Sequence, residues 1–182
     1  MKIYFDGCSF TYGNGLKDKL RTRYSQLVCN HYGAEEYNIA RGGGSNHRIA
    51  RNLLSADLSE YDMVVLQMTK RQRTEYCDGG DWKRVGLGNV MRKRDNEFWM
   101  TYYKDIYSDT YGIADEKIYY NLFRGMLRDK PHVILSIEEE PSVPVDFHIG
   151  KNIPRVDGNR SNRHPNEEGH QLICEGICES IL

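Results

Sequence analysis

The chain has 182 residues and a formal net charge of -1 at pH 7, and these values exclude several classes of protein. A chain of this length can bury about 70% of its unfolded surface in one domain, so we expect a single domain over residues 1–182. The near-zero charge gives no general attraction to nucleic acid or to anionic membranes. No apolar stretch approaches the ~18 residues that a membrane span needs.

Strand-like runs and helical patterns alternate along the chain. Short apolar or aromatic runs predict strands at 2–5 (KIYF), 36–40 (EYNIA), 62–68 (DMVVLQM) and 132–137 (HVILSI). Helical spacing of apolar residues predicts helices over 23–32, after the N-cap residue Ser45, and from Pro165 onward. Strands separated by helices indicate βαβ units, and therefore a parallel sheet with helices on both faces.

Small and polar residues follow three of the predicted strands. Ser9, the triple glycine Gly42–Gly44 and Thr69 each lie just past a strand end. The carboxyl ends of parallel strands meet at one edge of the sheet, where active sites gather. We therefore expect these three loops to converge on one site.

A polar insertion at about 70–98 interrupts the alternating pattern. A run of this length without regular structure is usually functional or mobile. From Lys70 to Arg94 it holds eight basic residues and three acidic ones. This composition indicates either a solvated loop or a binding site for an acidic or phosphorylated substrate. Four aromatic residues then recur every four positions. This spacing predicts either one helix face packed on the core or a platform that stacks against sugar rings or bases. They are Trp99, Tyr103, Tyr107 and Tyr111.

The cysteines and the first residues bear on the cellular compartment. Five cysteines is an odd number, and their spacing matches no zinc site. The chain opens on a strand-like run instead of a charged-then-apolar leader. We predict a reduced, cytoplasmic protein without a metal, and export by a route that leaves no leader is the alternative.

Motifs at both ends of the chain resemble those of the SGNH (GDSL-type) hydrolase family. The first block is DGCSFTYG, the second is NIARGGGSN, and His164-Pro165 stands in the last block. The blocks follow the family's order from Asp6 to about Leu172, and the chain looks most like small SGNH proteins of phages and bacteria. The resemblance implies a three-layer α/β/α fold with a flavodoxin-like parallel sheet, and ester hydrolysis without a cofactor.

The resemblance also assigns roles to individual residues. Ser9 would be the nucleophile and His164 the base, because a histidine near its ordinary pKa of ~6.5 can take the serine proton at neutral pH. The backbone N–H groups of Ser9 and Gly43 would stabilise the oxyanion. A glycine at position 43 lets the backbone approach the substrate closely.

Three departures from the family pattern leave parts of the site open. Cys8 replaces the aspartate of Gly-Asp-Ser. The third-block asparagine is missing from Gln67-Met68-Thr69, so Thr69 through its hydroxyl, or Asn46 or Gln67 through an amide, would complete the oxyanion hole. The family's acid stands three residues before the histidine, but this position is Ser161 here. The nearest carboxylate upstream is that of Asp157. Arg73 is a candidate substrate-binding residue, and the alternative that the resemblance implies is a structural ion pair with Glu75 at the site edge.

These observations support three functional hypotheses. The first is a serine esterase with a Ser-His dyad or weakened triad, cleaving an O-acetyl or short acyl group from a small-molecule or carbohydrate ester. The second is a catalytically impaired module that binds a glycan or polyanion through the basic insertion and the aromatic residues. The third is acyl transfer to an acceptor other than water. The sequence does not indicate an oligomeric state.

Overall fold

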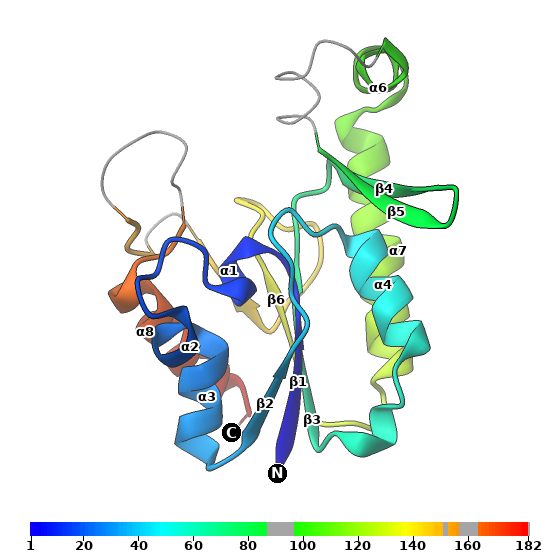
Figure 1. Cartoon of the computed structure of the whole chain (residues 1–182). Helices are drawn as coiled ribbons and strands as arrows, with labels where there is room; N and C mark the ends of the chain where they lie inside the picture. Colours follow the sequence, from blue (N-terminus) through cyan, green and yellow to red (C-terminus); the bar gives the residue numbers. More distant parts are fainter. Residues whose placement is uncertain (87–96, 151–152, 157–163, 182) are drawn as a thin grey trace.

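The centre of the computed structural model is a five-stranded sheet, and the structure describes residues 1–86, 97–150, 153–156 and 164–181. The strand order is β2-β1-β3-β6-β7, and every neighbouring pair is parallel (Figure 1). The strands are β1 Lys2–Asp6, β2 Glu35–Asn38, β3 Met63–Met68, β6 His132–Ser136 and β7 Phe147–His148. This order, in which the second strand lies outside the first, is that of flavodoxin-like sheets. The predicted fold class is confirmed.

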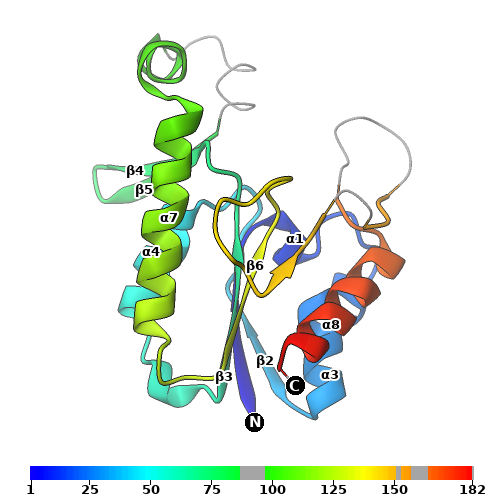
Figure 2. The same ribbon diagram turned by 180° about the vertical axis from the view of Figure 1, so that it is seen from behind.

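The helices cover both faces of this sheet and make three layers. Figures 1 and 2 show α3 and α8 on one face and α4 and α7 on the other. Alternate residues of each strand enter opposite cores, since successive side chains point to opposite faces. Phe5 packs with α3 and α8 in one hydrophobic cluster, and its neighbour Tyr4 packs with α4 and α7 in the other.

The helices begin where the sequence provides caps and turns. The helices are α1 Ser9–Tyr12, α2 Lys19–Thr22, α3 Tyr24–Tyr32, α4 Asn46–Ser55, α6 Glu97–Thr101, α7 Asp109–Met126 and α8 Glu167–Ile181. A short 3-10 helix, η1, covers Leu58–Glu60. Ser45 caps α4 as predicted, because its hydroxyl accepts a hydrogen bond from the Arg48 N–H at 3.1 Å. None of the helices in the described ranges is long and apolar enough to cross a membrane.

The polar insertion contains regular structure that the sequence analysis did not predict. The strands β4 (Arg73–Asp78) and β5 (Asp81–Gly86) pair as an antiparallel hairpin. Gly79 and Gly80 join them with φ angles of 58° and 95°, which a two-residue hairpin turn requires and glycine adopts without strain. The hairpin lies outside the central sheet and contacts α4, where Glu75 accepts from Arg51 at 2.9 Å (Figure 1). Residues 87–96 of the insertion lie outside the described residues.

The four regularly spaced aromatic residues do not form one helix face. Trp99 lies in α6, Tyr103 in the π-helix η2 (Tyr102–Ile106), Tyr107 at the end of η2 and Tyr111 in α7. Their rings contact one another and Tyr76 of the hairpin instead of the sheet core, with centroids 5.3 Å apart for Tyr76 and Trp99 and 5.8 Å for Tyr103 and Tyr107. The prediction of a single helix face is wrong because the chain changes direction at Tyr107.

Candidate active site

Ser9 lies on the turn that leads from β1 into the short helix α1. A Cβ at Gly7 would collide with the Thr11 hydroxyl and lie 2.8 Å from the Gln67 Cβ, so only glycine fits this turn. Ser9 is 6% exposed. Its hydroxyl lies 3.8 Å from the Cys8 sulfur, its sole hydrogen-bond partner among the described residues. The serine therefore stands at the carboxyl edge of the sheet, as the sequence predicts.

Gln67 holds this turn from the neighbouring strand β3. Its side-chain oxygen accepts hydrogen bonds from the Thr11 hydroxyl at 2.8 Å and the Thr11 N–H at 3.3 Å. Its amide nitrogen donates to the Met68 carbonyl at 3.1 Å, and the side chain is fully buried. The Gln67 amide is therefore occupied by the turn and is not available to an oxyanion.

The triple glycine packs its backbone directly against the serine turn. A Cβ at Gly44 would lie only 2.8 Å from the Gly7 carbonyl oxygen, and the Arg41 N–H donates to the same oxygen at 3.3 Å. Gly43 has a φ of 73°, in the left-handed region that favours glycine. In the described part of the chain, the N–H groups of Ser9 and Gly43 have no acceptor. Two unused donors thus lie on loops that touch.

Asn46 and Thr69 contact each other at the same edge. The Asn46 side-chain oxygen accepts from the Thr69 N–H at 2.7 Å, and its amide nitrogen makes a long, 3.5 Å hydrogen bond to the Thr69 carbonyl. The Thr69 hydroxyl is buried without a hydrogen-bond partner among the described residues. A buried hydroxyl without a partner is costly unless a ligand or water satisfies it.

His164 reaches the serine turn from the other end of the chain. Its ring lies edge-on to Phe10, the residue after Ser9, with centroids 5.7 Å apart. Burial lowers the pKa of His164 below 6.5, and the charges of Arg73 and Arg155 lower it further. The imidazole is therefore neutral at pH 7, the form that acts as a base. Its Nδ1 is buried, and within the described ranges it has no hydrogen bond to Ser9 or to any other group.

The residue that would orient His164 cannot be placed. Asp157, Ser161 and Asn162 all lie outside the described residues. The described part shows one relevant contact: the Val156 N–H donates to the His164 carbonyl at 3.0 Å, in an antiparallel bridge between Arg155 and Pro165. The backbone on both sides of the undescribed segment is therefore paired next to the histidine.

Arg73 faces the site and does not pair with Glu75, so that predicted ion pair is wrong. Glu75 instead accepts from Arg51 at 2.9 Å and from His47 at 3.2 Å. Burial opposes ionisation of the Cys8 thiol, but the Arg73 charge and hydrogen bonds, including one from Arg73, outweigh burial and lower its pKa. One Arg73 nitrogen, Nη1, is buried without a partner in the described part of the chain.

A buried ion pair between Asp6 and Arg48, which the sequence did not predict, lies next to the serine turn. Asp6, at the end of β1, is fully buried and accepts from Arg48 at 2.6 Å and Asn52 at 2.8 Å. Arg48 and Asn52 lie four residues apart on α4, so the pair fixes this helix against β1. The sequence signal was an aspartate at the end of a buried strand, a position that requires a partner for its charge.

Comparison with known proteins identifies the fold of the chain through solved structures of low sequence identity. No family model and no curated protein matches the sequence. A lipolytic protein assigned to the G-D-S-L family from Desulfitobacterium hafniense matches with a TM-score of 0.54 and 9% identity over 98% of both chains. The esterase EstA from Pseudoalteromonas sp. matches with a TM-score of 0.56 and 12% identity over 99% of this chain and 96% of its own. The acetylxylan esterase Axe2 from Geobacillus stearothermophilus matches with a TM-score of 0.55 and 14% identity over 99% and 93%.

These matches extend over nearly the whole chain. Identities of 9–14% are evidence for the fold alone, because one fold hosts many activities. The chain has the three-layer fold of GDSL-type esterases, and the resemblance seen in the sequence is confirmed at that level.

Proposed function

We propose that the protein is a serine esterase in which Ser9 is the nucleophile and His164 the general base. The observation that carries this proposal is the meeting of three separate segments at one sheet edge: the Ser9 turn, the Gly43 loop and the segment of His164. The esterase fold of the structural neighbours supports it. As substrate we propose an O-acetyl or short acyl ester of a small molecule or carbohydrate, because Axe2, an acetylxylan esterase, is one of the structural neighbours.

The reaction proceeds in two balanced steps. His164 takes the Ser9 proton as the oxygen attacks the ester carbonyl, and the resulting oxyanion accepts hydrogen bonds from the N–H groups of Ser9 and Gly43. Collapse of this intermediate breaks the bond to the alcohol, which leaves with the proton from the imidazolium. Water, deprotonated by His164, then attacks the acyl-serine, and the imidazolium returns the proton to the Ser9 oxygen as the bond to the acyl group breaks and the acid leaves.

Four further side chains complete the proposed site. The buried Thr69 hydroxyl, which has no partner in the described part of the chain, is the third oxyanion donor, and Asn46 holds its backbone in position. Arg73 contributes its unpaired Nη1 to substrate binding. Asp157 is the proposed acid of the weakened triad, because it follows Val156, whose N–H donates to the His164 carbonyl.

A fluorophosphonate probe tests the nucleophile, because it forms a covalent bond only with an activated serine. We expect the probe to label the wild type and the Cys8→Ala variant, and to leave Ser9→Ala and His164→Ala unlabelled. Ser55→Ala is the matched control, since Ser55 is an exposed serine on α4 and its loss leaves labelling intact. Full labelling of Ser9→Ala refutes the proposal. A folded wild type that neither reacts nor cleaves 4-nitrophenyl acetate favours the impaired binding module.

A further inference from the structure

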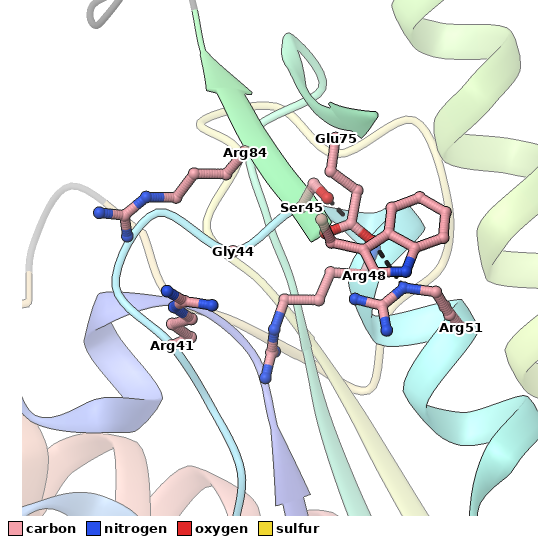
Figure 3. Close-up of a pocket in the computed structure, with 8 residues that line it drawn as sticks. Arg41, Gly44, Ser45, Arg48, Arg51, Glu75 and Arg84 are labelled. Carbon is pink, nitrogen blue, oxygen red and sulfur yellow. Dashed lines mark hydrogen bonds and ion pairs between the residues drawn. The ribbon is translucent and has the colours of Figure 1, made fainter. Parts of the chain in front are cut away.

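A small pocket rich in arginine lies next to the proposed oxyanion hole. Its walls come from the triple-glycine loop, the start of α4 and the β4–β5 hairpin (Figure 3). The lining residues are Arg41, Gly44, Ser45, Arg48, Arg51, Glu75, Trp82 and Arg84. The pocket therefore joins the catalytic edge of the sheet to the hairpin, which the sequence analysis left without structure.

Two of the four arginines in this pocket have a carboxylate partner and two do not. Arg48 pairs with the buried Asp6, and Arg51 pairs with Glu75 while stacking over the Trp82 ring at 4.4 Å. Arg41 and Arg84 form no ion pair with any described residue. The described residues of the pocket thus leave two positive charges without a carboxylate partner.

One of these two arginines, Arg84, contacts the triple-glycine loop. The Arg84 side chain donates to the Gly42 carbonyl, and its Nη1 lies 3.4 Å from the position that a Cβ of Gly43 would occupy. Gly44 and Ser45 line the pocket at the N-terminus of the ten-residue helix α4, whose dipole adds a partial positive charge. An anion bound here would lie next to an ester held at Gly43.

We propose that this pocket binds an anionic substituent, a carboxylate or a phosphate, of the ester substrate. Guanidinium groups match both groups with paired hydrogen bonds, which are strong when charge-assisted. The overall charge of -1 argues for one local anionic group and against an extended polyanion such as nucleic acid. This inference rests on the proposed esterase function and narrows its substrate to acidic esters.

Matched esters test the substrate class by kinetics. We compare three mono-O-acetylated sugars: methyl glucoside, which is neutral, methyl glucuronide, which carries a carboxylate, and glucose 6-phosphate, which carries a phosphate. For the wild type we expect kcat/KM to be about 10-fold to 100-fold higher for at least one anionic ester than for the neutral one. The double variant Arg41→Gln/Arg84→Gln should lose most of this ratio. Arg128→Gln should retain it, because Arg128 is an equally exposed arginine near the opposite edge of the sheet, between α7 and β6.

Direct binding separates failure of this inference from failure of the esterase proposal. Calorimetry with Ser9→Ala needs no turnover, and we expect methyl glucuronide or glucose 6-phosphate to bind at low salt. Adding Arg41→Gln and Arg84→Gln should abolish that binding. Equal kcat/KM for all three esters, or a ratio that survives the double variant, overturns the inference while the esterase proposal stands. Anion binding in a protein that cleaves no ester overturns the esterase proposal and retains the anion pocket.

Discussion

The close contact between the triple glycine and the serine turn makes Gly44→Ala the most informative single substitution. The φ angle of Gly44 is not in the left-handed region, so alanine adopts its backbone without strain and the effect is purely steric. The new Cβ would lie 2.8 Å from the Gly7 carbonyl oxygen and 3.1 Å from that of Arg41. Both obstacles are backbone atoms, which cannot rotate away as a side chain would.

The size of the effect follows from these distances. Ordinary contact with a Cβ begins at 3.4 Å, so the two loops must separate by about 0.6 Å. A misplacement of 1 Å costs on the order of 100-fold in rate, so we expect kcat/KM for 4-nitrophenyl acetate to fall by roughly 10-fold. Overpacking costs about 1–3 kcal/mol, which for a chain of this size lowers Tm by roughly 2–12 °C.

The control for this experiment is Gly125→Ala. Gly125 lies in α7, and a Cβ there meets no atom within 4 Å, so activity and Tm should not fall. Steady-state kinetics and thermal unfolding of both variants give the comparison. Wild-type kcat/KM in Gly44→Ala would show that the spacing of these loops does not set the oxyanion donors, and would refute the reasoning.

Three further substitutions address the charges around the site. Arg73→Gln removes a positive charge that lowers the pKa of His164, so the acidic limb of the pH profile of kcat/KM should move to higher pH. Arg73→Lys keeps the charge and should leave the limb where it is. An unmoved limb in Arg73→Gln contradicts the assignment of His164 as the base. Asp157→Asn should lower kcat by up to about 10⁴-fold if Asp157 is the triad acid, and a loss below about 10-fold assigns that role elsewhere. Burial lowers the pKa of His170 to about 4 in the folded protein, whereas the same histidine in the unfolded chain has a pKa near 6.5. Between about pH 6.5 and pH 4 the unfolded chain therefore binds a proton that the folded protein does not. The free energy of unfolding should fall by up to about 3 kcal/mol over this range. Urea unfolding should show a smaller loss for His170→Gln, and an equal loss would assign the acid sensitivity to other groups.

The sequence predicted four of the five strands of the central sheet, all but the two-residue β7, and the convergence of the site loops, because both follow from strong local signals. The run MVVLQM (63–68) is fully buried as β3, and the small residues after β1 and β2 lie together because parallel strands end at one edge. The order of the motifs added His164, which no periodicity could have connected to Ser9.

The hairpin and α7 were missed for different physical reasons. The β4 and β5 strands expose most of their residues, so they lack an apolar alternation, although the pair Gly79-Gly80 between two aspartates is a hairpin signal. Helix α7 fully buries only Gly112, Glu116 and Phe123, while Tyr119, Tyr120 and Met126 pack against the core partly buried, so its apolar face is weakly marked in the sequence. Its stability comes from packing on the sheet, which a single sequence does not reveal.

The departures from the family pattern become connected once the structure is known. Cys8 lies on the turn after β1, and side chains from β3 and β4 act on its thiol: Gln67 through its amide nitrogen at 3.4 Å and Arg73 through its charge. A thiol replaces the family's carboxylate at position 8, and a half-buried cation lies beside it. In the sequence, the cysteine and the missing third-block asparagine read as two separate losses. In space, Cys8, Gln67 and Arg73 belong to one polar cluster next to Ser9. Burial is the main cause that keeps His164 neutral for its role as a base, and the same Arg73 charge that lowers the pKa of Cys8 also lowers that of His164.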